Sequence, residues 1–264
     1  MELFVFVSAT VIYAVLGLCF GSFLNVVVYR LPRGLNLARP GSHCTKCNHP
    51  LAWYDNIPLL SFIILRGRCR YCKEPISPRY FVVEALNCLL WAMCAAVWRD
   101  SLPFAAVAAV ALSVLLAMAL CDADQMFIPD SLQLCLLVTA VVGIFTDEAV
   151  VWSEKLIGLA VGLGFFLLFY LISFPMFGRE GLGFGDVKLM GSAGLLLGYK
   201  AVCCAIIFAL MPAFIAVVAR RLTYDGRSLM EDDSFPFAPY LAFGICAALF
   251  FGNELAAMYL TFIS

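Results

Sequence analysis

Two aspartates lie at the edges of strongly apolar segments. Asp122 closes one apolar run and Asp186 opens another. A carboxylate beside hydrocarbon is energetically costly, so its presence there indicates a function. Two facing carboxylates can share one proton, with one acid ionised and the other protonated. The ionised acid can deprotonate a water that attacks a peptide carbonyl, and the protonated acid can donate to the developing oxyanion. The pair therefore predicts peptide hydrolysis with neither a metal nor a covalent nucleophile.

The residues around the aspartates bear on this assignment. Gly183 and Gly185 precede Asp186 in a Gly-x-Gly-Asp string, where glycine lets an extended substrate approach the main chain. The string alone is weak evidence, and it gains weight from the second boundary aspartate elsewhere in the chain. Asp124 is the alternative to Asp122 as the second acid, although we expect it to be solvated.

Four cysteines form two Cys-x-x-Cys pairs with 21 residues between the pairs: Cys44, Cys47, Cys69 and Cys72. Four thiolates can surround one zinc ion tetrahedrally. Cytoplasmic thiols are kept reduced, which favours a metal over disulfides. We expect a structural zinc site in a small zinc-ribbon-like domain, with a redox dithiol pair or free cysteines as alternatives. His43 and His49 flank the first pair and are left out, because four cysteines fill the coordination sphere.

The composition is that of a membrane protein. The 264 residues are 64% hydrophobic and only 13% charged, with a mean hydropathy of +0.97. Apolar runs long enough to cross a bilayer recur along most of the chain, which predicts an all-α polytopic membrane protein with about eight transmembrane helices. We place the spans at about 3–29, 81–98, 102–121, 130–146, 156–177, 187–199, 201–219 and 236–252.

The segment 30–80 differs from the rest of the chain in its charge. It holds nine basic and two acidic residues, a net charge of +7, which places it in the cytoplasm by the positive-inside rule. We therefore expect a first transmembrane helix at 1–29, a cytoplasmic zinc-binding loop domain at 30–80, and a transmembrane domain at 81–264 that carries the aspartate pair.

Alternation of the spans then fixes the side of each remaining loop. It puts Asp122 and Asp186 at the cytoplasmic face, although 64 positions separate them. The charged loops agree with the positive-inside rule. Those expected outside carry Asp147, Glu148, Glu154 and Lys155, and those expected inside carry Arg220, Arg221 and Arg227.

Two apolar runs are too short to cross a bilayer in the ordinary way. The run 187–199 makes a helix of roughly 20 Å, below the ~30 Å of hydrocarbon. Its glycines, Gly191, Gly194 and Gly198, suggest close packing in the bundle or a wall of a wet cavity. A poorly bounded ordinary span is the alternative. The run 59–65 (LLSFIIL) is either a small core of the loop domain or a patch lying against lipid.

Further strings complete a pattern that runs nearly end to end: 21–32 (GSFLNVVVYRLP), 53–61 (WYDNIPLLS), 66–70 (RGRCR), 128–130 (IPD), 183–189 (GFGDVKL) and 236–239 (PFAP). Together with the cysteine pairs and Asp122, these strings resemble those of the bacterial type IV prepilin peptidases, the leader peptidase/N-methyltransferases of the aspartic GxGD class. One departure is Ala238, where glycine is expected. We expect Ala238 to lie away from the aspartates.

The resemblance implies an enzyme of the bacterial inner membrane whose active site faces the cytoplasm. It implies cleavage of the basic leader of type IV prepilins or type II pseudopilins after a glycine, with Asp122 and Asp186 as the catalytic acids. It also implies N-methylation of the new N-terminus with S-adenosylmethionine, whose binding residues the sequence does not identify. The expected partners are prepilins or pseudopilins and membrane lipids, and no nucleic acid.

Three other functions stay open on the sequence alone. A peptidase that lacks the methyltransferase activity would differ only in methyl transfer. A cation- or proton-coupled transporter would use the boundary aspartates as ion ligands. An assembly scaffold would use the cysteine pairs to recruit secretion proteins, and it would not need either aspartate.

Overall fold

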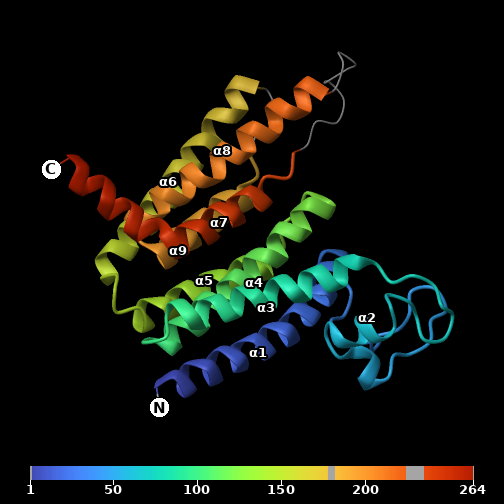
Figure 1. Ribbon diagram of the computed structural model, residues 1–264. Helices are drawn as coiled ribbons and strands as arrows, with labels where there is room; N and C mark the ends of the chain where they lie inside the picture. Colours follow the sequence, from blue (N-terminus) through green and yellow to red (C-terminus); the bar gives the residue numbers. More distant parts are fainter. Residues whose placement is uncertain (1, 178–181, 224–234, 264) are drawn as a thin grey trace. The chain divides into compact units, whose positions relative to one another are not determined.

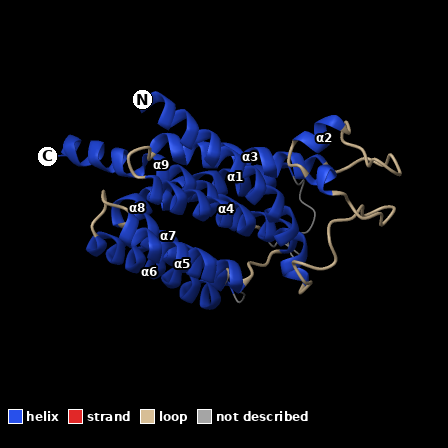
Figure 2. Ribbon diagram, turned by 90° about the horizontal axis from the view of Figure 1, so that it is seen from below, coloured by secondary structure: helices blue, strands red, loops and turns tan. Residues whose placement is uncertain are grey.

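The computed structural model describes residues 2–177, 182–223 and 235–263 (Figure 1). The predicted cytoplasmic residue Arg227 lies outside these ranges. The described residues form helices and loops without a β-strand, which confirms the predicted all-α class (Figure 2). The α-helices are α1 (Glu2–Arg30), α2 (Leu60–Ile64), α3 (Pro78–Val97), α4 (Leu102–Gln125), α5 (Asp130–Thr146), α6 (Trp152–Phe177), α7 (Phe184–Leu197), α8 (Tyr199–Thr223) and α9 (Ala238–Ile263).

The predicted number of about eight transmembrane spans is not confirmed. Six of the described helices are long and apolar enough to cross a membrane, namely α1, α3, α4, α6, α8 and α9. Helix α5 has 17 residues and α7 has 14, so they extend about 26 Å and 21 Å along their axes. Both fall short of the ~30 Å hydrocarbon layer. Each predicted span corresponds to a helix, but two of these helices are shorter than a span requires.

The chain divides into two compact units, 1–109 and 110–264. In the first unit α1 packs along α3, and Gly17 permits the close approach, because a Cβ there would lie 2.8 Å from the Cβ of Trp91. Asn87 is fully buried and donates from Nδ2 to the carbonyl of Gly17 at 2.8 Å, which satisfies its amide inside the apolar contact. The predicted division at 29/30 and 80/81 stays a prediction.

Helix α2 belongs to the segment 59–65, for which a small core and a lipid-facing patch were both expected. Phe62 contacts Phe81 at the start of α3, with ring centroids 5.3 Å apart. Leu60, Ile63 and Ile64 are at least half exposed. The helix is therefore anchored to α3 by one side chain and presents an apolar surface with the others.

In the second unit α7 is the central helix. It contacts α5, α6, α8 and α9, and eleven of its fourteen residues are buried. Gly194 lies directly against the backbone of Gly158 in α6, so neither position has room for a side chain. Of the two expected roles for the glycine-rich run, the structure supports close helix packing.

Polar contacts hold the C-terminal end of α7. Lys155 of α6 is fully buried, and its Nζ donates to Asp147 Oδ2 at 2.7 Å and to the carbonyl of Leu196 at 3.1 Å. A cation at the negative end of a helix is electrostatically favourable. The short helix is therefore fixed at the end opposite to Asp186.

Candidate active site and metal cluster

Asp122 lies in the last turn of α4 and faces the first residue of α9. Its carboxylate is buried, and Oδ2 accepts a hydrogen bond of 2.9 Å from the backbone N–H of Ala238. The first N–H groups of a helix have no partner within the helix, and the helix dipole is positive at this end. The N-terminus of α9 therefore stabilises negative charge on Asp122.

This contact corrects the expectation for Ala238. The residue was expected to lie away from the aspartates, but it is fully buried and donates directly to one of them. The expectation was wrong because 116 positions separate the two residues in the sequence, and only the fold brings the start of α9 against the end of α4. The contact uses the backbone N–H alone, so an alanine in place of the expected glycine leaves it intact.

Asp186 lies in the first turn of α7, outside the six helices long enough to cross a membrane. The predicted span began at 187, whereas the helix begins at Phe184 and includes the aspartate. Gly183 is the N-cap, and Asp186 Oδ2 lies 3.5 Å from the position that a Gly183 Cβ would take. The carboxylate thus folds back over the start of its own helix, as an acidic residue at the third helical position does in a capping box.

The environment of Asp186 favours the protonated form. Burial and, second, the negative charge of Asp122 raise the pKa of Asp186 to about 7, although a hydrogen bond with the Gly183 backbone opposes this shift. The effect of Asp122 shows that the two acids lie near enough to interact. Asp122 is 8% exposed and Asp186 is 7% exposed, whereas Asp124 is exposed. The structure thus brings together the two predicted acids and leaves the alternative acid at the surface.

Gln133 is a polar residue of this site that the sequence analysis did not single out. It lies in the first turns of α5, is 5% exposed, and donates from Nε2 to the carbonyl of Gly185 at 2.7 Å. Its Oε1 is buried and has no hydrogen-bond partner among the described residues. The available signal was a glutamine between two leucines on a short helix, one turn after the Ile-Pro-Asp string.

Lys188 and Asp130 form an ion pair between α7 and α5, with Nζ and Oδ1 2.7 Å apart. Asp130 lies in the first turn of α5. The pair lies at the surface, near the start of α7, and gives Lys188 an acidic partner.

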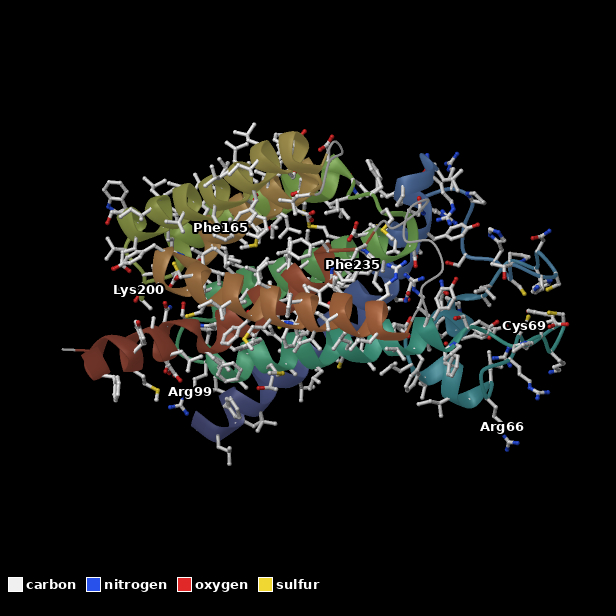
Figure 3. All side chains as sticks on the ribbon, turned by 90° about the horizontal axis from the view of Figure 1, so that it is seen from above. Arg66, Cys69, Arg99, Phe165, Lys200 and Phe235 are labelled. Carbon is white, nitrogen blue, oxygen red and sulfur yellow. The ribbon has the colours of Figure 1, made fainter. Side chains whose placement is uncertain are left out.

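The four predicted metal-ligating cysteines gather in the loop of the first unit. Figure 3 shows Cys69 in this loop. One ligand atom from each cysteine lies within 4.8 Å of the other three, so the cluster can hold a metal ion. Neither histidine belongs to the cluster; His49 instead packs against the ring of Tyr71 with centroids 3.5 Å apart. The members are Cys44, Cys47, Cys69 and Cys72.

The two cysteine pairs have the same backbone design. The N–H of Cys44 donates to the carbonyl of His49 at 3.0 Å, and the N–H of Cys69 donates to that of Glu74 at 2.8 Å. The residue after each second cysteine, Asn48 or Lys73, has a positive φ, 56° or 62°, which reverses the chain. Each pair is therefore shaped by hydrogen bonds within about six residues.

An ion pair between an exposed arginine and a buried aspartate supports the second cysteine pair. Arg70 Nη2 lies 2.7 Å from Asp55 Oδ1, and the Asp55 side chain is 1% exposed. Hydrogen bonding and attraction to Asp55 raise the pKa of Arg70. Because Arg70 follows Cys69 directly, this pair links the 53–56 turn to the cluster.

Comparisons with known proteins identify the family. The model of the bacterial peptidase A24 N-terminal domain matches residues 15–98, and that of the type IV leader peptidase family matches residues 109–219. A prepilin leader peptidase/N-methyltransferase of Aeromonas hydrophila is 35% identical over 93% of this chain and 91% of its own. The protein of the same name from Pseudomonas aeruginosa is 34% identical, with 97% and 94% covered.

A relative from Myxococcus xanthus with this name is 40% identical over 81% of this chain and 63% of its own length. No solved structure matches the chain. The two family models adjoin one another, and the relatives from Aeromonas and Pseudomonas align over nearly their whole lengths. The chain therefore belongs to the bacterial type IV leader peptidase family.

Proposed function

We propose that this protein removes the leader of type IV prepilins or pseudopilins with Asp122 and Asp186 as its catalytic acids, at the cytoplasmic face of the inner membrane. The observation that carries the proposal is the pair of buried carboxylates, one set against the start of α9 and the other within the first turn of α7. Family membership supports the peptidase activity and gives no support to an ion-coupled transporter.

The different environments of the two acids support a different role for each. Asp122, which accepts the Ala238 N–H at a helix N-terminus, acts as the ionised general base. Asp186, whose pKa is raised to about 7, holds a proton near neutral pH and acts as the general acid. Two acids with unlike environments can thus divide acid and base catalysis between them.

The reaction proceeds by addition and then elimination. Asp122 takes a proton from water as the water oxygen attacks the scissile carbonyl, and Asp186 gives its proton to the carbonyl oxygen. The resulting tetrahedral diol collapses when Asp122 passes its proton to the leaving nitrogen and Asp186 recovers one from a hydroxyl. The C–N bond breaks, one water is consumed, and both acids return to their starting states.

The substrate's chemistry suits this position. A basic leader is attracted to the ionised acid of the aspartate pair, Asp122, and not to the loop at 30–80, whose net charge is +7. The arginines of that loop are better placed to meet anionic lipid headgroups. The apolar surface of α2, formed by Leu60, Ile63 and Ile64, suits the same lipid interface.

We further propose that the cysteine cluster holds a structural zinc ion. Zinc with four thiolates at about 2.3 Å places the sulfurs about 3.8 Å apart. The Sγ atoms of Cys44 and Cys72 are 3.8 Å apart, which fits this geometry and is far too long for a disulfide. Zinc would link the two cysteine pairs and stabilise the loop, because the loop has little apolar core of its own.

Methyl transfer rests on the name that the relatives carry. A cavity of about 430 Å³ in the loop is lined by Leu65, Arg66, Arg68, Cys69 and Lys73. Its basic lining does not suit the positively charged sulfonium of S-adenosylmethionine. We therefore assign no residue of this chain to the methyl donor.

The test is cleavage of a purified prepilin by the detergent-solubilised protein, followed by mass spectrometry of the new N-terminus. Asp122→Asn and Asp186→Asn should each lower cleavage by at least about 1,000-fold, because each removes a proton-transfer step. Asp124→Asn is the matched control and should cleave at the wild-type rate. Cleavage by both folded variants, Asp122→Asn and Asp186→Asn, would refute the proposal. Loss of cleavage in Asp124→Asn, with cleavage retained in Asp122→Asn, would identify Asp124 as the second acid.

A further inference from the structure

The buried side-chain amide of Gln133, close to the aspartates, has one acceptor atom without a hydrogen-bond partner among the described residues. The Gln133 side chain donates from Nε2 to the Gly185 carbonyl at 2.7 Å. Only the amide nitrogen can donate to a carbonyl, so this contact fixes the orientation of the side chain. Oε1 consequently points away from Gly185, and it is buried without a partner among the described residues.

Leaving this oxygen unpaired is costly. A buried acceptor that loses water and gains no donor costs about 1–3 kcal/mol, and apolar residues of similar size would avoid that cost. Gln133 is 95% buried, so water does not reach it from the surface. Ile128 lies on the same side of Gly185 as Gln133, because side-chain atoms of both are within 3.7 Å of the position that a Gly185 Cβ would take.

The proposed substrate brings the matching group. A peptide bond can be hydrolysed only when its segment is extended, and an extended main chain at the membrane boundary has N–H groups without partners. A side-chain amide is neutral, so it can accept from a peptide N–H without disturbing the charge of the dyad. Gly185 directly precedes Asp186, so Gln133 lies where such a segment must pass.

We infer that Gln133 is a substrate-binding residue: the Gly185 carbonyl orients its amide, and Oε1 accepts a main-chain N–H of the prepilin next to the scissile bond. The inference rests on the proposed function. It names a peptide main chain as the ligand, so it makes no demand on the prepilin side chains.

A backbone ester scan tests the inference. Prepilin peptides are prepared in which one amide at a time, on either side of the scissile bond, is replaced by an ester, which removes a single N–H. In the wild-type protein one of these esters should lower kcat/KM by about tenfold or more. In Gln133→Leu the kcat/KM for the all-amide peptide should be lower by about tenfold or more. The same ester should then lower kcat/KM by less than about twofold further.

This double comparison separates a hydrogen bond from a general structural effect, because only a direct contact couples the two changes. Thr139→Val is the matched control. Thr139 is buried on the same helix, and its hydroxyl donates to the carbonyl of Cys135 within that helix, so the ester penalty should stay as in wild type.

An equal ester penalty in wild type and Gln133→Leu would overturn the inference, as would the lack of any ester effect in wild type. If Gln133→Leu does not fold, Gln133→Met removes the amide with an unbranched side chain, and the same double comparison is made with that variant. Cleavage of the all-amide peptide by wild type, and its loss in Asp186→Asn, show that the proposed function stands independently of this result.

Discussion

The cysteine cluster and the aspartate pair are built in opposite ways. The four sulfurs of the cluster come from positions 44–72, and hydrogen bonds among neighbouring residues close each cysteine pair. The aspartate pair joins α4 and α7, takes an N–H from α9, and is bordered by an amide from α5. The first centre therefore depends on local backbone shape and a metal, whereas the second depends on how four helices pack.

The largest effect is expected from metal removal, which should disrupt the cluster and spare the dyad. Structural zinc in small domains contributes on the order of 10 kcal/mol to folding. Cys44→Ser should lose the bound metal and make the 30–80 loop sensitive to protease, while prepilin cleavage falls by less than about tenfold. Metal analysis, limited proteolysis and the cleavage rate measure these outcomes.

Cys19→Ser, at an exposed cysteine of α1, is the control and should behave as wild type. A loop that stays protease-resistant without metal would contradict the structural role of zinc. If Cys44→Ser lost cleavage activity to the same extent as bound metal, the two centres would not be independent of one another.

A packing change far from the aspartates should lower cleavage and leave the cysteine cluster intact. A side chain at Gly194 would meet the backbone of Gly158, so Gly194→Leu must push α7 away from α6. Displacing a catalytic group by about 1 Å can cost roughly 100-fold in rate, so cleavage should fall by about that factor. Metal content should not change.

Gly164→Leu is the matched control, because a Cβ at Gly164 meets nothing within 4 Å. It should retain wild-type cleavage. If Gly194→Leu cleaves normally while remaining folded, the dyad does not depend on the α6–α7 contact.

The next effect concerns the pH dependence of stability. In the unfolded chain Asp186 ionises near its ordinary pKa of about 4, whereas burial holds the folded pKa at about 7. Between these pH values the folded protein keeps a proton that the unfolded chain has lost, so this group makes folding less favourable as pH rises from about 4 to 7. Asp186→Asn should remove that penalty.

Its free energy of unfolding should therefore exceed that of wild type by on the order of 4 kcal/mol at pH 8, with little difference at pH 4. Thermal unfolding in detergent across this range measures the difference. Asp124→Asn, at an exposed site, should show no such trend. A gain that is independent of pH would argue against a protonated Asp186 in the folded state.

The smallest effect is expected at the surface ion pair of Lys188 and Asp130. Their side chains are 41% and 83% exposed, and exposed pairs contribute less than about 1 kcal/mol. Lys188→Ala should change cleavage by less than about twofold, and Asp130→Ala should give the same result. A much larger loss in Lys188→Ala alone would show that this lysine acts on the dyad after all.

The sequence by itself determined the membrane class, the cysteine cluster, the two acids and the resemblance to a family. These features follow from composition, from the side-chain types of Asp and Cys, and from spacings of a few residues, all of which are explicit in the chain. The predicted number of about eight spans is not confirmed, because α5 and α7, with 17 and 14 residues, are shorter than a span requires. Helix α7 can be short because neighbouring helices cover most of it.

Only the tertiary structure decided which neutral groups serve the acids. Every residue except proline carries a backbone N–H, so nothing in the string marked that of Ala238 as the partner of Asp122. The same holds for Gln133, whose amide is ordinary until packing buries it beside Gly185 and leaves Oε1 without a partner among the described residues. Hydrogen-bonding capacity is written in the sequence, but which groups lack a partner is settled by the packing of distant helices.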